Sequence, residues 1–143
     1  MTVISNIFLV DSPAPAVHLL LAPVLVAAGY PSPAQDYFDG RLNLNDHLIQ
    51  DVTSTYVVRV SGHSMEGAGI SDGDELIVNR ALEPKDGSII VAVLDGELTI
   101  KRLRLMGGGV VLQAENPEYP DIRVADLQSL TVWGVAQTCL HHL

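Results

Sequence analysis

From residue 56 onward the sequence is a succession of short runs rich in β-branched residues, separated by residues typical of turns. Such runs predict strands, and the chain has six of them: 56–60, 75–78, 88–94, 98–103, 110–114 and 131–136. Asp95-Gly96 lies between two of these runs and is the strongest hairpin signal in the chain. No long amphipathic helical pattern interrupts the series. The sequence therefore predicts a small, mostly-β domain of about six or more strands.

The first forty residues have a different character. They carry three aspartates, no Lys or Arg, and most of the prolines. We therefore expect residues 1–40 to form an extended N-terminal arm and residues 41–143 to form the mostly-β domain. At the start of that domain, Asn43 or Asn45 can cap a short helical turn through Leu48 and Ile49.

An apolar run over residues 16–28 raises the question of a membrane segment or a secretory signal. The run has thirteen residues, interrupted by His18 and Pro23, whereas a bilayer-spanning helix needs about 20. The small residues at 26–29 imitate a signal cleavage site, but residues 1–11 lack the positive charge of a signal peptide. We expect no membrane segment and a cytoplasmic location.

Charge and cysteine content exclude several function classes. The chain of 143 residues has 17 acidic and 8 basic residues, a formal net charge of −9, which argues against direct, nonspecific binding of DNA. Cys139 is the lone cysteine, so neither an internal disulfide nor a multi-cysteine metal site can form. A lone cysteine also fits a reducing compartment, and its default role is that of a small packing residue.

A candidate nucleophile follows the first expected strand of the domain. Ser64 lies in the sequence Ser-Gly-His-Ser-Met at 61–65, next to the glycine-rich loop 67–69. A loop after a rigid strand can expose a nucleophile, although an isolated polar turn is the commoner explanation of such a sequence. His63 is poorly placed as the base for Ser64, because adjacent side chains of an extended chain point in opposite directions.

Lys101 is the alternative base. Strand alternation places it on the same face as Thr99, Leu103 and Leu105, opposite Arg102 and Arg104. Burial on an apolar face favours the neutral amine, and a base at neutral pH needs its pKa lowered by roughly 3 units from about 10.4. The competing interpretation is a lysine that extends its amine to water from the edge of a strand.

These residues together resemble the LexA/UmuD family of Ser-Lys self-cleaving peptidases, and within it the UmuD branch. The resemblance extends from about residue 25 to about residue 136. It rests on several short blocks in the same order, among them 28–34, 61–65, 69–74 and 95–101. It implies a compact LexA-like, β-clip-like C-terminal peptidase domain preceded by the extended arm, and no cofactor.

The resemblance also assigns roles to individual residues. Ser64 is implied as the nucleophile, Lys101 as its general base, and Ala28-Gly29 as the bond that is cut. The backbone N–H groups of Ser64 and His63 are implied as the oxyanion hole. Ala28 and Gly29 are small, which suits a segment that must enter a cleft.

The implied biological role is that of an accessory subunit of an error-prone translesion DNA polymerase in the SOS response to DNA damage. A RecA nucleoprotein filament is expected to stimulate cleavage, and the product 29–143 is expected to form a homodimer that joins a UmuC-type Y-family polymerase subunit. A repressor is not expected, because 28 residues without Lys or Arg cannot form a helix-turn-helix DNA-binding domain.

Two other functions remain open from the sequence. One is a Ser-Lys peptidase that cuts other proteins in trans, like the signal peptidases, but those enzymes have a membrane anchor. The other is a non-catalytic module of the same fold that binds RecA or the polymerase. Ala28-Gly29 in the same chain as Ser64 and Lys101 weighs against the second alternative.

Overall fold

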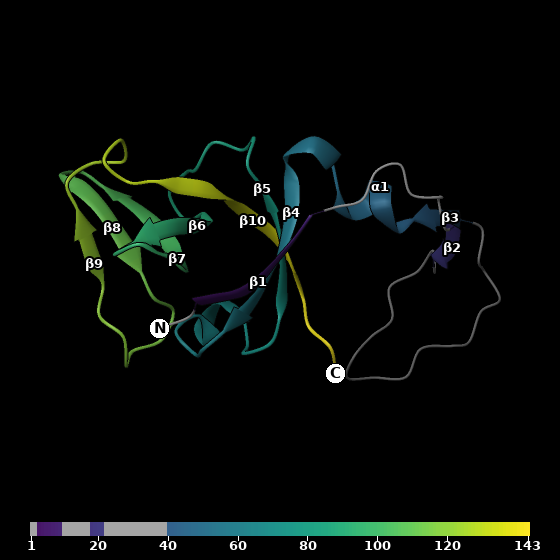
Figure 1. Ribbon diagram of the computed structural model, residues 1–143, viewed down its shortest axis with the longest axis horizontal. Helices are drawn as coiled ribbons and strands as arrows, with labels where there is room; N and C mark the ends of the chain where they lie inside the picture. Colours follow the sequence, from purple (N-terminus) through teal and green to yellow (C-terminus); the bar gives the residue numbers. More distant parts are fainter. Residues whose placement is uncertain (1–2, 10–17, 22–39) are drawn as a thin grey trace. The chain divides into compact units, whose positions relative to one another are not determined.

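The computed structural model describes residues 3–9, 18–21 and 40–143 (Figure 1). The chain divides into two compact units, one of residues 1–11 and 51–143 and one of residues 12–50. Strand β1 (Val3–Leu9) belongs to the first unit, so this division differs from the boundary expected at residues 40 and 41. The apolar and β-branched residues of β1 favour an extended strand, which explains why this segment pairs with a neighbouring strand of the sheet.

The smaller unit contains a two-stranded antiparallel sheet and a short helix. Strand β2 (His18–Leu21) pairs with β3 (Gly40–Asn43), and helix α1 (Leu44–Leu48) follows directly. The Asn43 side chain caps this helix by accepting a hydrogen bond of 3.0 Å from the Asn45 N–H, which confirms one of the two expected caps. Within the described residues, no helix is long and apolar enough to cross a membrane.

The larger unit is built on an eight-stranded sheet in which neighbouring strands are antiparallel (Figure 1). The prediction of a mostly-β domain is confirmed, and each of the six expected strands is present. Strands β1 and β9 are additional. The order across the sheet is β1, β4 (Thr55–Ser61), β5 (Glu75–Asn79), β10 (Val132–Leu140), β6 (Ile89–Leu94), β7 (Glu97–Met106), β8 (Gly109–Gln113) and β9 (Ile122–Val124).

The β6–β7 hairpin sets the register of Lys101. Its two-residue turn has positive φ at both positions, 50° at Asp95 and 79° at Gly96, as a type I′ turn requires. The hairpin predicted at this dipeptide is therefore confirmed. The turn aligns Leu94 with Glu97 and, further along the ladder, Ile90 with Lys101.

Two apolar clusters hold the larger unit together, and β7 contributes to both. Ile100 packs in one cluster with Met65 of the loop after β4, and Leu103 packs in the other with Ile90 and Leu112. All five residues are fully buried. Burying one such side chain contributes about 1.5–3 kcal/mol to the stability of the fold. The backbone on both sides of Lys101 is therefore fixed by packing.

Candidate active site

The loop after β4 holds Ser64 in a buried position. Gly62 has a φ of 104°, which a residue with a side chain rarely adopts, and its N–H donates to Asp72 Oδ1 at 2.8 Å. Met65 is fully buried in the core, and its carbonyl accepts hydrogen bonds from two later N–H groups, at 3.0 Å and 3.2 Å. Ser64 itself is 0% exposed. The loop is thus anchored on both sides of the serine.

Lys101 reaches this loop from the middle of β7. Its Nζ lies 3.3 Å from Ser64 Oγ, and the residue as a whole is 2% exposed. Thr99 and Leu103 on the same face of the strand are also buried, as alternation predicted, whereas Leu105 is exposed. The alternative of a lysine extended into water does not hold in this structure.

Burial lowers the pKa of Lys101 below its ordinary value of 10.5, because the ammonium loses solvation. None of the ion pairs among the described residues includes Lys101, so no carboxylate offsets that loss. A neutral amine 3.3 Å from a serine hydroxyl can accept its proton after a small side-chain adjustment. The arrangement has the geometry that a nucleophile and its general base need.

His63 lies beside this pair but makes contacts elsewhere. Its ring is exposed, and its Nδ1 contacts Glu66 Oε1. Its carbonyl oxygen accepts a hydrogen bond of 2.8 Å from the side-chain amide of Asn116. The structure therefore brings Ser64 and Lys101 together and engages the His63 ring with a surface glutamate.

Sequence reasoning missed the residues that hold the loop from outside, Glu115 and Asn116. The Gly67 N–H donates to the Glu115 carbonyl at 2.7 Å, and a Cβ at Gly67 would lie only 2.6 Å from that oxygen. In the sequence, the dipeptide Asn116-Pro117 indicates only a turn. Contacts that join residues 53 positions apart leave no local pattern in a single sequence. The proposed cleavage site, Ala28-Gly29, lies outside the described residues.

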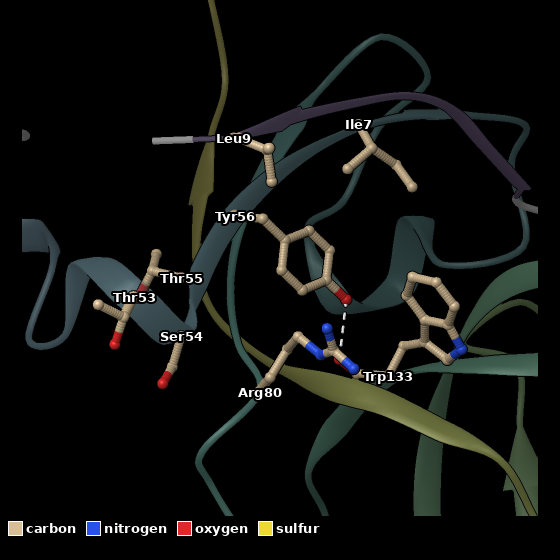
Figure 2. Close-up of a pocket in the computed structure, with 8 residues that line it drawn as sticks. All are labelled: Ile7, Leu9, Thr53, Ser54, Thr55, Tyr56, Arg80 and Trp133. Carbon is tan, nitrogen blue, oxygen red and sulfur yellow. Dashed lines mark hydrogen bonds between the residues drawn. The ribbon is translucent and has the colours of Figure 1, made fainter. Parts of the chain in front are cut away.

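A separate hollow lies between β1, β4 and β10, away from the dyad. It has a volume of about 120 Å³, with Ile7 and Leu9 on one side of the Tyr56 ring and Arg80 and Trp133 at its hydroxyl end (Figure 2). Burial raises the pKa of Tyr56 to about 12, so its hydroxyl stays protonated and donates to the Trp133 carbonyl at 3.0 Å. Neither Ser64 nor Lys101 lines this hollow.

The described residues were also compared with the requirements of a metal site. In the part of the chain that the structure describes, no group of three or more His, Cys, Asp or Glu side chains could hold a metal ion.

Comparison with known proteins shows which protein family this chain resembles. Residues 21–137 match the model of the family described as Peptidase S24-like. The chain is 42% identical to protein MucA of Salmonella typhimurium over 111 residues, which are 77% of this chain and 75% of MucA. It is 38% identical to protein ImpA of the same species, over 80% of this chain and 77% of ImpA. It is 44% identical to the LexA repressor of Delftia acidovorans, over 87% of this chain but only 56% of the repressor.

Proposed function

This chain belongs to the peptidase S24 family, and we propose that Ser64 and Lys101 are its catalytic dyad. It is a UmuD-like serine peptidase that cleaves itself and has a role in the SOS response. The observation that carries the dyad is the contact of 3.3 Å between Lys101 Nζ and Ser64 Oγ in a buried site. The lowered pKa of Lys101 supports the same assignment.

The proposed reaction begins with proton transfer from Ser64 Oγ to the neutral Lys101 amine. Oγ attacks the carbonyl carbon of Ala28, and the N–H groups of Ser64 and His63 stabilise the oxyanion of the tetrahedral intermediate. The Lys101 ammonium then gives its proton to the nitrogen of Gly29 as the peptide bond breaks. This step leaves Ala28 as an ester on Ser64 and Lys101 neutral again.

The second half of the reaction repeats these roles with water. Lys101 accepts a proton from water as the water oxygen attacks the ester carbonyl of Ala28. The returned proton restores the Ser64 hydroxyl and frees a carboxylic acid on Ala28, which loses its remaining proton to the solvent. Because the substrate is part of the same chain, a high effective concentration replaces the affinity that a free peptide would need.

We also propose the partners and setting of this reaction. A RecA nucleoprotein filament stimulates cleavage, and it can do so only by binding the cleavage-competent state more tightly than the resting state. The product 29–143 forms a homodimer and joins a UmuC-type Y-family polymerase subunit in the cytoplasm as a translesion accessory factor. The similarity to MucA and ImpA supports a place in this context.

Mass spectrometry of the incubated chain tests the dyad and the cleaved bond together. The wild-type chain, kept at alkaline pH or with RecA assembled on single-stranded DNA, is expected to give a fragment that begins at Gly29. Ser64→Ala is expected to stay intact under both conditions. An intact wild-type chain would contradict the self-cleaving reaction, and cleavage of Ser64→Ala would contradict the nucleophile.

A further inference from the structure

The turn after β8 holds the active-site loop on both sides of Ser64. Glu115 and Asn116, which we call the 115–116 clamp, contact the loop through different groups. The Asn116 side-chain amide donates to the His63 carbonyl at 2.8 Å, before the serine. The Glu115 carbonyl accepts the Gly67 N–H at 2.7 Å, after the serine. Two consecutive residues thus bracket the nucleophile.

The orientation of the Asn116 amide is fixed by its own turn. Its Oδ1 accepts the Glu118 N–H at 3.0 Å, and its backbone carbonyl accepts the Tyr119 N–H at 3.1 Å. With Oδ1 held by a backbone donor, Nδ2 is the end of the amide that faces His63. The hydrogen bonds therefore determine which end of the Asn116 amide is oxygen and which is nitrogen.

The clamp is also tied to the strand that carries Lys101. Arg102 Nε donates to Glu115 Oε1 at 2.5 Å, and its Nη1 donates to the Gly87 carbonyl at 2.7 Å. Arg102 directly follows Lys101 on β7 and pairs in register with Gln113 at the end of β8. One short segment thus connects the serine loop with the lysine strand.

The bond to His63 has a consequence for the next residue because a peptide unit is planar. The carbonyl of His63 and the N–H of Ser64 belong to the same unit and point in opposite directions. A donor that fixes the carbonyl therefore also fixes the direction of the Ser64 N–H. Donors in an oxyanion hole act through such preorganisation.

We propose that Asn116 is a positioning residue that orients the His63–Ser64 peptide unit, so that the Ser64 N–H points at the developing oxyanion. The inference rests on the proposed self-cleaving function for its catalytic consequence. The peptide orientation itself can be measured without any cleavage.

Asn116→Asp keeps the shape and the Oδ1 acceptor for Glu118, and it replaces the donor toward His63 with a charged carboxylate oxygen. The longer contact of 3.5 Å from the Glu66 N–H to the His63 carbonyl remains, and Asn116→Ala removes the donor without adding charge. Self-cleavage rates are compared on the alkaline plateau of the pH profile, where a shift in the pKa of Lys101 has no effect. The plateau rate is expected to fall at least about tenfold, less than the 10²–10³-fold typical of losing an oxyanion donor itself. Asn116→Ala is expected to show a similar loss.

The second readout is the NMR order parameter of the residue-64 N–H, measured in the uncleavable Ser64→Ala background. We expect about 0.85 with Asn116 present and a value below about 0.6 when Asn116→Asp is added. The control is Asp126→Ala, which removes the acceptor for the Ser129 N–H in another turn. It is expected to change neither the plateau rate nor this order parameter.

Each result decides the matter. The proposal would be overturned if the residue-64 N–H stays rigid both with Asn116 present and in Asn116→Asp. An unchanged plateau rate in Asn116→Asp would overturn it as well. An equal rate loss in Asp126→Ala would overturn it too, since general loosening would then explain the effect. If the wild-type chain is never cleaved, the proposed function fails, and the order parameter alone decides whether Asn116 orients the peptide.

Discussion

The chain has two lysines, and they lie in regions with opposite properties. In the dyad region, formed by residues 61–69 and β7 at Lys101, the lysine residue is 2% exposed and its amine contacts Ser64. In two surface turns, residues 85–88 and 106–109, Lys85 is exposed to water. The glycines differ as well, since a Cβ at Gly67 would meet the Glu115 carbonyl and a Cβ at Gly108 would meet nothing within 4 Å.

The difference shows that the surroundings, and not the residue type, determine the chemistry. Water solvates the Lys85 ammonium and leaves it an ordinary surface charge. Burial at Lys101 removes that solvation and favours the amine that a general base requires. The two surface turns therefore supply matched controls for the changes at Lys101 and Gly67.

The largest expected contrast is between Lys101→Ala and Lys85→Ala. Loss of the general base is expected to lower the first-order rate of self-cleavage by about 10²–10⁴-fold, whereas Lys85→Ala leaves it within about twofold of wild type. The rate is measured by gel densitometry of the intact chain over time. Equal rates for the two variants would break the contrast between the regions.

The next contrast is between Gly67→Ala and Gly108→Ala. The new Cβ at residue 67 would lie 2.6 Å from the Glu115 carbonyl oxygen, so the loop must move and carry Ser64 away from Lys101. We expect a loss of cleavage rate of about tenfold, equivalent to about 1.4 kcal/mol in the barrier. Gly108→Ala is expected to cleave at the wild-type rate, and a similar loss there would show that the effect is not local.

The dependence of the free energy of unfolding on pH also distinguishes the two lysines. The folded chain holds Lys101 at a lowered pKa, so below that pKa the ammonium is penalised only in the folded state. The penalty disappears as pH rises from the folded pKa to the unfolded value of 10.5, and stability rises over this window. Lys101→Met is expected to stabilise the chain at neutral pH by about 1–3 kcal/mol and to remove this rise.

Urea unfolding at several pH values measures the effect, and Lys85→Met is the control. Lys85 is exposed, and surface substitutions usually change stability little, so the control is expected to match the wild type within about 0.5 kcal/mol. A Lys101→Met chain that is less stable than wild type at neutral pH would contradict a penalised ammonium.

The smallest expected effect lies within the dyad region, at His63. Its ring is exposed and contacts Glu66, and an exposed ion pair contributes about 0–1 kcal/mol. His63→Gln keeps the backbone and is expected to cleave within about twofold of the wild-type rate. A much larger loss at neutral pH would point to the histidine, not the lysine, as the base.

The sequence predicted much of the larger unit because its signals there are local. β-branched runs and the Asp95-Gly96 turn gave six strands and the hairpin that sets the register of Lys101. The alternation along β7 also placed Lys101 on a buried face. The family resemblance predicts that Ser64 and Lys101 act together, and their side chains are in contact in the structure.

Other features depend on contacts that join distant parts of the chain. The lack of basic residues and the many prolines predict an arm over residues 1–40, yet Val3 of β1 pairs with both Ser61 and Thr99. The bond from Asn116 to His63 spans 53 residues, and nothing near Asn116 in the sequence indicates it. Such contacts exist only once the strands are in register.

The most direct test of a neutral Lys101 acting as base is the pH dependence of self-cleavage in the wild type and in Lys101→Arg, measured between about pH 6 and about pH 11. The wild-type rate is expected to rise with pH and reach a plateau, with its midpoint below 10.5. Arginine stays protonated over this range, so Lys101→Arg is expected to remain intact. A wild-type rate that is independent of pH, or cleavage of Lys101→Arg at the wild-type rate, would contradict the dyad.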